Sequence, residues 1–146
     1  VHRVQAGSQL LPRFRTLDDM EAMVRIISVT FGPLTDAQWR HLTVNSATQF
    51  EDGSWGFRYD PGIAIPFQKK PLADVDLWPY WDAITSPTLL LRGAQSDLLL
   101  KETATEMARR GPRPRLVEFD GIGHAPMLMA DDQIAAVRNF LLEDQP

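Results

Sequence analysis

The chain has 146 residues, enough for one domain of ordinary size, and its 44% hydrophobic and 23% charged content is typical of a globular protein. Its 15 basic and 19 acidic residues give a formal net charge of −4, which argues against nucleic acid or an anionic membrane surface as a partner. The absence of cysteine excludes disulfides and thiolate metal sites, and without a membrane-length apolar run or a signal-peptide pattern we expect a cytoplasmic protein.

The first part of the sequence predicts two amphipathic helices. Thr16-x-x-Asp19 is a capping signal, and Gly32-Pro33 is a stop signal for the helix that it begins. Thr35-x-x-Gln38 is a capping box that begins the second helix. The apolar positions recur at helical spacing: Leu17, Met20, Val24, Ile27 and Phe31 in the first helix, and Trp39, Leu42, Ala47 and Phe50 in the second.

A strand follows these helices. Asp52-Gly53 predicts a turn, and in residues 54–59 large aromatic side chains alternate with smaller or polar ones, as on a half-buried strand. Prolines at 61, 66 and 71 predict an irregular segment after it. We therefore expect residues 1–72 to form a helical segment with a small hairpin, and residues 73–146 to form a separate part.

The second part has the β-α-β-α order of a parallel sheet. We expect a short helix over 77–84, a strand around 88–91 that is covered on both faces, a helix that ends at Gly111, and a second strand over 115–119. Asp131 or Asp132 should cap a final helix. The side chains expected to face inward are Leu100, Ala104, Met107 and Ala108 in the first long helix, and Ile134, Val137, Phe140 and Leu141 in the last.

An aspartate and a histidine follow the two predicted strands. Asp97 lies on the loop after the first strand, and His124 lies on the loop after the second, in Asp120-Gly-Ile-Gly-His124. Ligands of open parallel sheets bind beyond the carboxyl ends of the strands, so both residues occupy a favourable place. A carboxylate that orients an imidazole, which in turn takes a proton from a nucleophile, is the arrangement of a hydrolase triad. We therefore predict Asp97 and His124 as catalytic residues.

Simpler roles exist for each of these residues. Asp97 alone is an ordinary turn residue, and His124 alone could bond to the backbone of its glycine-containing loop. Trp81, with its aromatic neighbours, could line a substrate entrance or pack inside the protein. His2 and His41 have no partner at metal-ligand spacing, and no Gly-rich phosphate loop occurs, so we propose neither a metal nor a cofactor.

Residues 77–97, the segment Gly121-Ile-Gly-His-Ala-Pro126 and the closing helix resemble the C-terminal half of an α/β-hydrolase fold enzyme of the esterase, lactonase and C–C-bond hydrolase type. The resemblance implies an α/β fold class, with parallel strands and flanking helices preceded by a mostly helical cap. It also implies that Asp97 is the triad acid and His124 the general base, and that Leu98 and Met127 lie near the acyl pocket. The implied substrate is a small ester, a lactone or an activated carbonyl compound.

The nucleophile of such an enzyme is missing from the sequence. The family's Gly-x-Ser-x-Gly motif does not occur, because none of the six serines has the flanking glycines. We expect a serine or an aspartate nucleophile in an N-terminal half that would be the chain's partner, so that this chain alone is inactive and associates with itself. The alternative is a short, non-catalytic relative of the hydrolases that binds a small molecule or a protein partner.

Overall fold

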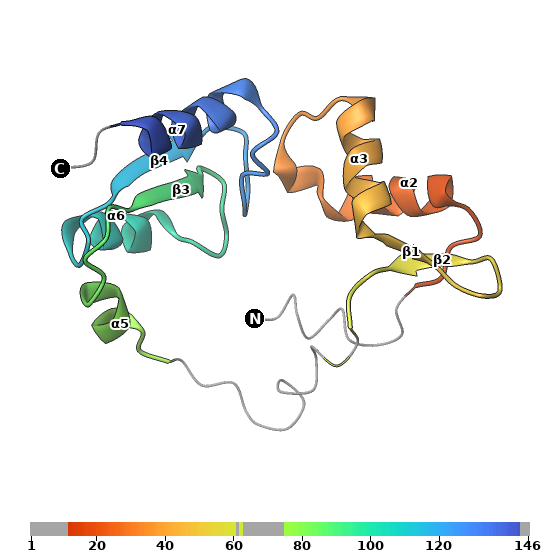
Figure 1. The fold of residues 1–146 in the computed structure, drawn as a ribbon, viewed down its shortest axis with the longest axis horizontal. Helices are drawn as coiled ribbons and strands as arrows, with labels where there is room; N and C mark the ends of the chain where they lie inside the picture. The colour runs from red at the N-terminus through yellow and green to blue at the C-terminus, as the bar shows by residue number, and fades with distance from the viewer. Residues whose placement is uncertain (1–11, 61, 63–74, 144–146) are drawn as a thin grey trace. The chain divides into compact units, whose positions relative to one another are not determined.

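The computed structural model describes residues 12–60, 62 and 75–143, which form two compact units (Figure 1). The first unit contains the described residues up to Ile27 and those between Thr35 and Val75, and the second contains Ser28–Leu34 and the residues from Asp76 on. The expected boundary between residues 72 and 73, and the prolines at 61, 66 and 71, lie outside the described residues. The sequence did not predict that Ser28–Leu34 belongs to the second unit.

Two helices, α2 (Leu17–Ile27) and α3 (Asp36–Ser46), pack against each other in the first unit. Both predicted caps are confirmed: the Asp19 N–H donates to Thr16 Oγ1 over 3.0 Å, and Thr35 and Gln38 form a reciprocal capping box. Met20 and Val24 of the predicted apolar face are buried, as is Trp39 of α3.

The predicted ends of both helices are wrong. Helix α2 stops at Ile27, and a separate 3₁₀ turn, η1 (Val29–Phe31), follows it. Helix α3 stops at Ser46, because Ala47 begins a strand that pairs with Phe57 across a hairpin. Strand β1 (Ala47–Gln49) and strand β2 (Trp55–Phe57) form an antiparallel hairpin, so the strand predicted over 54–59 is confirmed in its centre.

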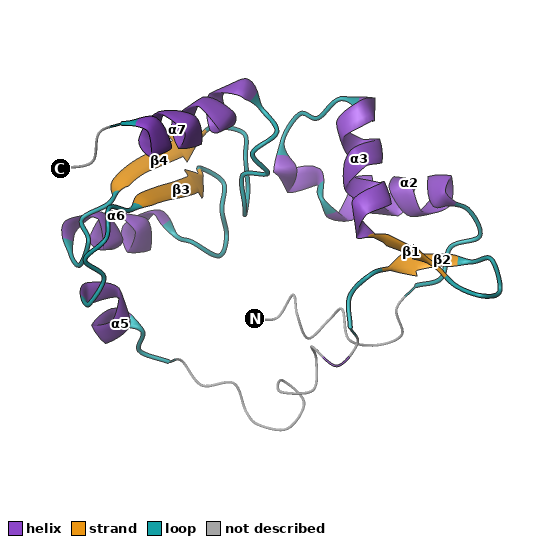
Figure 2. Ribbon diagram, in the orientation of Figure 1, coloured by secondary structure: helices purple, strands orange, loops and turns teal. Residues whose placement is uncertain are grey.

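The second unit contains a parallel pair of strands, as predicted. Strand β3 (Leu89–Gly93) pairs with β4 (Arg115–Phe119), in a register that places Leu89 opposite Arg115 and Gly93 opposite Phe119. Helices α5 (Trp78–Asp82), α6 (Lys101–Arg109) and α7 (Asp131–Leu142) complete the unit. Figure 2 shows the strands between α6 and α7, so the two helices lie on opposite faces of the pair.

Several apolar side chains expected inside this unit are exposed. Leu89, Leu90 and Leu91 of β3 are only half-buried, although a strand covered on both faces was predicted. Leu100, Ile134 and Leu141 are exposed, which corrects their predicted inward positions. The predicted aspartate cap of α7 is also wrong, since Ala130 occupies the cap position and Asp131 begins the helix. The helices are amphipathic as predicted, but the described residues provide no surface that covers these side chains.

Candidate active site

The loops that follow β3 and β4 are joined at one edge of the sheet. Beyond the last paired residues, the Ala94 N–H donates to Phe119 O and the Gln95 N–H donates to Ile122 O, each over 2.9 Å. These bonds continue the ladder into the loops. The side chains that the two loops carry therefore meet at the carboxyl end of the strands, where parallel sheets bind ligands.

The loop after β3 has a defined shape because both peptide groups of Leu99 are bonded. The Leu99 N–H donates to Ser96 Oγ over 3.0 Å, and the Leu99 carbonyl accepts a 2.8 Å bond from Nε of Arg92. Arg92 is a buried side chain of β3, and its guanidinium also bonds to Glu118 of β4 over 2.5 Å. The turn that carries Asp97 is thus held by hydrogen bonds at both the N–H and the carbonyl oxygen of Leu99.

His124 meets this loop through Ser96. The Ser96 Oγ lies 3.3 Å from Nδ1 of His124, and Ser96 is only 7% exposed, whereas His124 is exposed. Because the hydroxyl oxygen already accepts the Leu99 N–H, it has one lone pair and its proton left for the imidazole. The hydroxyl accepts from Nδ1 when that nitrogen carries a hydrogen and donates to it when it does not. It can therefore keep the hydrogen bond to the ring in either case.

Sequence reasoning missed this serine, because it tested Ser96 only as a nucleophile. The position of Ser96 in a predicted turn, directly before Asp97, does favour a bond from the backbone to its hydroxyl. Serine hydroxyls in turns commonly bond to the backbone two or three residues further along, as Ser96 does to Leu99.

Asp97 follows Ser96 on the same loop and is exposed. The structure therefore places Asp97, the predicted acid, and His124, the predicted base, on two joined loops. Asp97 directly follows Ser96, whose hydroxyl bonds to the His124 imidazole. The pairing of the Asp97 carboxylate with the imidazole stays a prediction. Leu98, half exposed, directly follows Asp97, and the partly buried Met127 lies three residues after His124, so both flank the pair in sequence.

Trp81 lies at the opposite end of the sheet. Its indole Nε1 donates to the carbonyl oxygens of Met107 and Arg110, each over 3.2 Å, where α6 ends. Helix α6 runs back from the carboxyl end of β3 to the amino end of β4, so its last turn lies away from His124. Trp81 is thus bonded to the last turn of α6, and its predicted contact with substrate stays a prediction.

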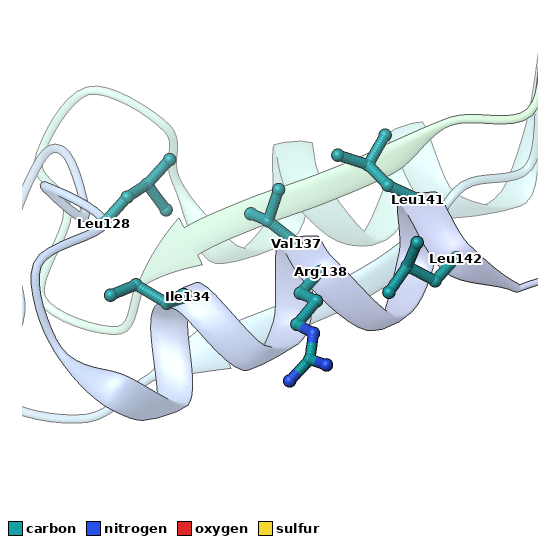
Figure 3. Close-up of a pocket in the computed structure, with 6 residues that line it drawn as sticks. All are labelled: Leu128, Ile134, Val137, Arg138, Leu141 and Leu142. Carbon is teal, nitrogen blue, oxygen red and sulfur yellow. The ribbon is translucent and has the colours of Figure 1, made fainter.

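An apolar hollow of about 360 Å³ lies along α7 in the second unit. Figure 3 shows Leu128, Ile134, Val137 and Leu141 on the same side of this helix, whereas the Arg138 guanidinium points away. The complete lining is Leu128, Ile134, Val137, Arg138, Leu141 and Leu142. Asp97 and His124 are not among the residues that line this hollow.

Two further kinds of site are absent from the described part of the chain. There, no group of three or more histidine, aspartate or glutamate side chains is arranged to hold a metal ion. Within the same residues, no helix has the length and apolar character needed to cross a bilayer.

A parallel strand pair between two helices, with a carboxylate and an imidazole on adjoining strand-end loops, also occurs in the α/β-hydrolase fold. The structure of an α/β hydrolase from Novosphingobium aromaticivorans superimposes with a TM-score of 0.82 at 34% identity, covering 96% of this chain and 50% of that one. This chain is therefore part of an α/β-hydrolase fold.

Two curated relatives are similar in sequence. A 3-hydroxybutyrate-oligomer hydrolase from Cupriavidus necator is 40% identical over 96% of this chain and 50% of its own length. A pimeloyl-[acyl-carrier protein] methyl ester esterase from Aromatoleum aromaticum is 37% identical over 50% of this chain and 28% of its own length. No family model matches the sequence. The chain thus spans about half the length, or less, of the curated relatives it matches.

Proposed function

We propose that this chain supplies the acid and the base of a hydrolase that cleaves a small ester through a nucleophile–histidine–acid triad. The observation that carries the proposal is the junction of the two strand-end loops, where Ser96 Oγ bonds to His124 and Asp97 is the next residue. With a serine nucleophile, His124 takes the hydroxyl proton as the oxygen attacks the ester carbonyl and gives it to the leaving alkoxide; His124 then takes a proton from the water that hydrolyses the acyl-enzyme and returns it to the serine. Asp97 orients the imidazole and stabilises its protonated form.

The names of the relatives favour an ester as the bond that is cleaved. One acts on an oligomer of a hydroxy acid, whose units are joined by ester bonds, and the other on a methyl ester. We therefore place short esters of hydroxyalkanoic acids first among the substrates, followed by lactones, which are internal esters, and other activated carbonyl compounds. Leu98 and Met127, which flank the predicted pair in sequence, are proposed to contact the acyl group.

The nucleophile is proposed to come from a second half of the fold, which would be the partner of this chain. The relatives are about twice as long as the matched region. In the described part of the chain, β3 pairs on one side only, with β4, and its leucines are half-buried. The hollow along α7 is apolar as well. A sheet edge and two uncovered apolar surfaces are what a further set of parallel strands and helices would bury.

The test uses the polypeptide that carries both this chain and the proposed nucleophile-bearing half, with p-nitrophenyl butyrate and the 3-hydroxybutyrate dimer as substrates. His124→Ala should lower kcat by about 10³-fold or more, and Asp97→Asn by a factor approaching about 10⁴, the loss found for the same change in a serine protease. His41→Ala is the control, because His41 is an exposed histidine of α3 in the other unit. Full activity of His124→Ala would refute the proposal.

A further inference from the structure

The loop that ends in His124 is held by a segment from much earlier in the chain. The Gly123 N–H donates to the Thr30 carbonyl oxygen over 2.6 Å. Thr30 lies in the 3₁₀ turn η1, within the segment Ser28–Leu34 that belongs to the same unit as His124. The residue directly before the proposed catalytic histidine is therefore bonded to neither β3 nor β4 but to this turn.

The loop is also enclosed sterically, because Gly123 has no room for a side chain. A Cβ atom on Gly123 would lie 2.6 Å from Cβ of Thr30. On the other side, a Cβ on Gly93 at the end of β3 would lie 2.5 Å from the Ile122 carbonyl oxygen and would also overlap that of Gly123. The backbone of residues 122–123 thus passes between β3 and the turn at Thr30 without free space.

Gly32 completes this enclosure. A Cβ on Gly32 would overlap Cδ1 of Ile122, and the φ of Gly32 is +89°, a value that side-chain-bearing residues rarely adopt. Ile122 is buried, so a shift of its side chain has to be accommodated by the residues packed around it. Gly32 is therefore required both by its backbone conformation and by its contact with the histidine loop.

We infer that the segment Thr30–Gly32 is a positioning element that sets the location of the His124 imidazole; this inference rests on the proposed function. The imidazole is exposed and bonds to Ser96, so its place depends on the backbone that carries it. That backbone is fixed by the Thr30 carbonyl and by the fit between Gly32 and Ile122. A displacement of about 1 Å at a catalytic group can cost about 10²-fold in rate.

The first test compares two glycines in the complete hydrolase. Gly32→Ala should lower kcat for p-nitrophenyl butyrate by about 10–100-fold and change KM by less than about threefold, because it moves the base and leaves substrate binding intact. Gly53→Ala is the matched control: Gly53 has a similar φ of +81°, but a Cβ there meets nothing within 4 Å. It shares the positive φ without the contact.

A second variant keeps the test decisive if Gly32→Ala folds poorly. Ile122→Val removes the Cδ1 atom that the new methyl group would strike, so Gly32→Ala/Ile122→Val should regain the part of the lost kcat that the contact causes, relative to Ile122→Val alone. Hydrogen exchange at Gly123, followed in the same proteins, should speed up at least about tenfold in Gly32→Ala and return toward the original rate in the double variant.

The outcomes separate this inference from the proposed function. If His124→Ala abolishes hydrolysis but Gly32→Ala behaves like Gly53→Ala in kcat and in Gly123 exchange, the positioning role is refuted and the triad stands. If His124→Ala retains full activity, the triad is refuted. In that case, Gly123 exchange still reports whether Thr30–Gly32 holds the loop.

Discussion

Ser96 links the two loops of the candidate site through one hydroxyl group. Its oxygen accepts the Leu99 N–H and bonds to Nδ1 of His124, so the geometry of the acid loop and the orientation of the imidazole depend on the same atom. The positions of Asp97 and His124 could be predicted, because strand-end loops follow directly from the pattern of apolar runs. The bond from Ser96 could not, because it depends on how the two loops approach each other.

Ser96→Ala should therefore weaken both the fold and the reaction. The Leu99 N–H loses its acceptor in a largely buried place, which should lower the free energy of unfolding by about 1–3 kcal/mol. In the complete hydrolase, kcat should fall by about 10-fold while KM changes little, because the imidazole is less well oriented. Urea denaturation and steady-state kinetics measure the two effects. The control is Ser86→Ala, at an exposed loop position. Equal behaviour of the two variants would contradict the role of Ser96.

A cluster of ion pairs joins α2 to α3. Glu21 bonds to Arg25 of its own helix over 2.6 Å and to Arg40 of α3 over 3.2 Å, and Arg40 also bonds to Asp18 over 2.6 Å. The hydrogen bond from Arg25, followed by that from Arg40, holds the pKa of the Glu21 carboxyl below its ordinary value, although partial burial opposes this shift.

The lowered pKa of Glu21 predicts a loss of stability in acid. A carboxylate with a lower pKa in the folded state stabilises that state above its unfolded pKa, and this contribution disappears as the pH falls through the folded pKa. At about pH 7, Glu21→Gln and Arg40→Ala should each lower the free energy of unfolding by about 0.2–1 kcal/mol, and at about pH 2 the coupling between them should vanish. A double-mutant cycle by urea denaturation at both pH values measures this coupling. Coupling that is unchanged in acid would contradict the prediction.

Helix starts could be predicted from the sequence better than helix ends. The Thr16 and Thr35 caps are local, since each side chain bonds to a backbone N–H three residues along, and both were predicted correctly. The end of α3 depends on Ala47 pairing with Phe57, a tertiary contact that a helical apolar pattern does not reveal. The same reason explains the exposed Leu141: its place on an apolar stripe is visible in the sequence, but the surface that would cover it is not.

The described part of the second unit has an unpaired strand edge and an exposed apolar helix surface, which predict that the isolated chain associates with itself. Strand β3 pairs only with β4 among the described residues, and an unpaired strand edge is a template for pairing with another chain. On α7, Leu141 and Leu142 are each 70% exposed beside the apolar hollow. Burial of such a leucine contributes about 1.5–3 kcal/mol, enough to drive association at micromolar concentration when several act together.

Sedimentation velocity of the isolated 146-residue chain should therefore show oligomers or aggregates, and the chain should have no esterase activity by itself. Leu141→Glu should shift the population toward smaller species, because a buried carboxylate without a partner is costly at the contact. Ile26→Glu is the matched control, since Ile26 is 69% exposed on α2 in the other unit and lies outside the hollow.

If the proposed second half of the fold covers these surfaces, adding it should suppress association and restore hydrolysis together. A monodisperse monomer with a cooperative thermal transition would contradict the proposal that β3 and α7 expose surfaces which a further part of the fold buries.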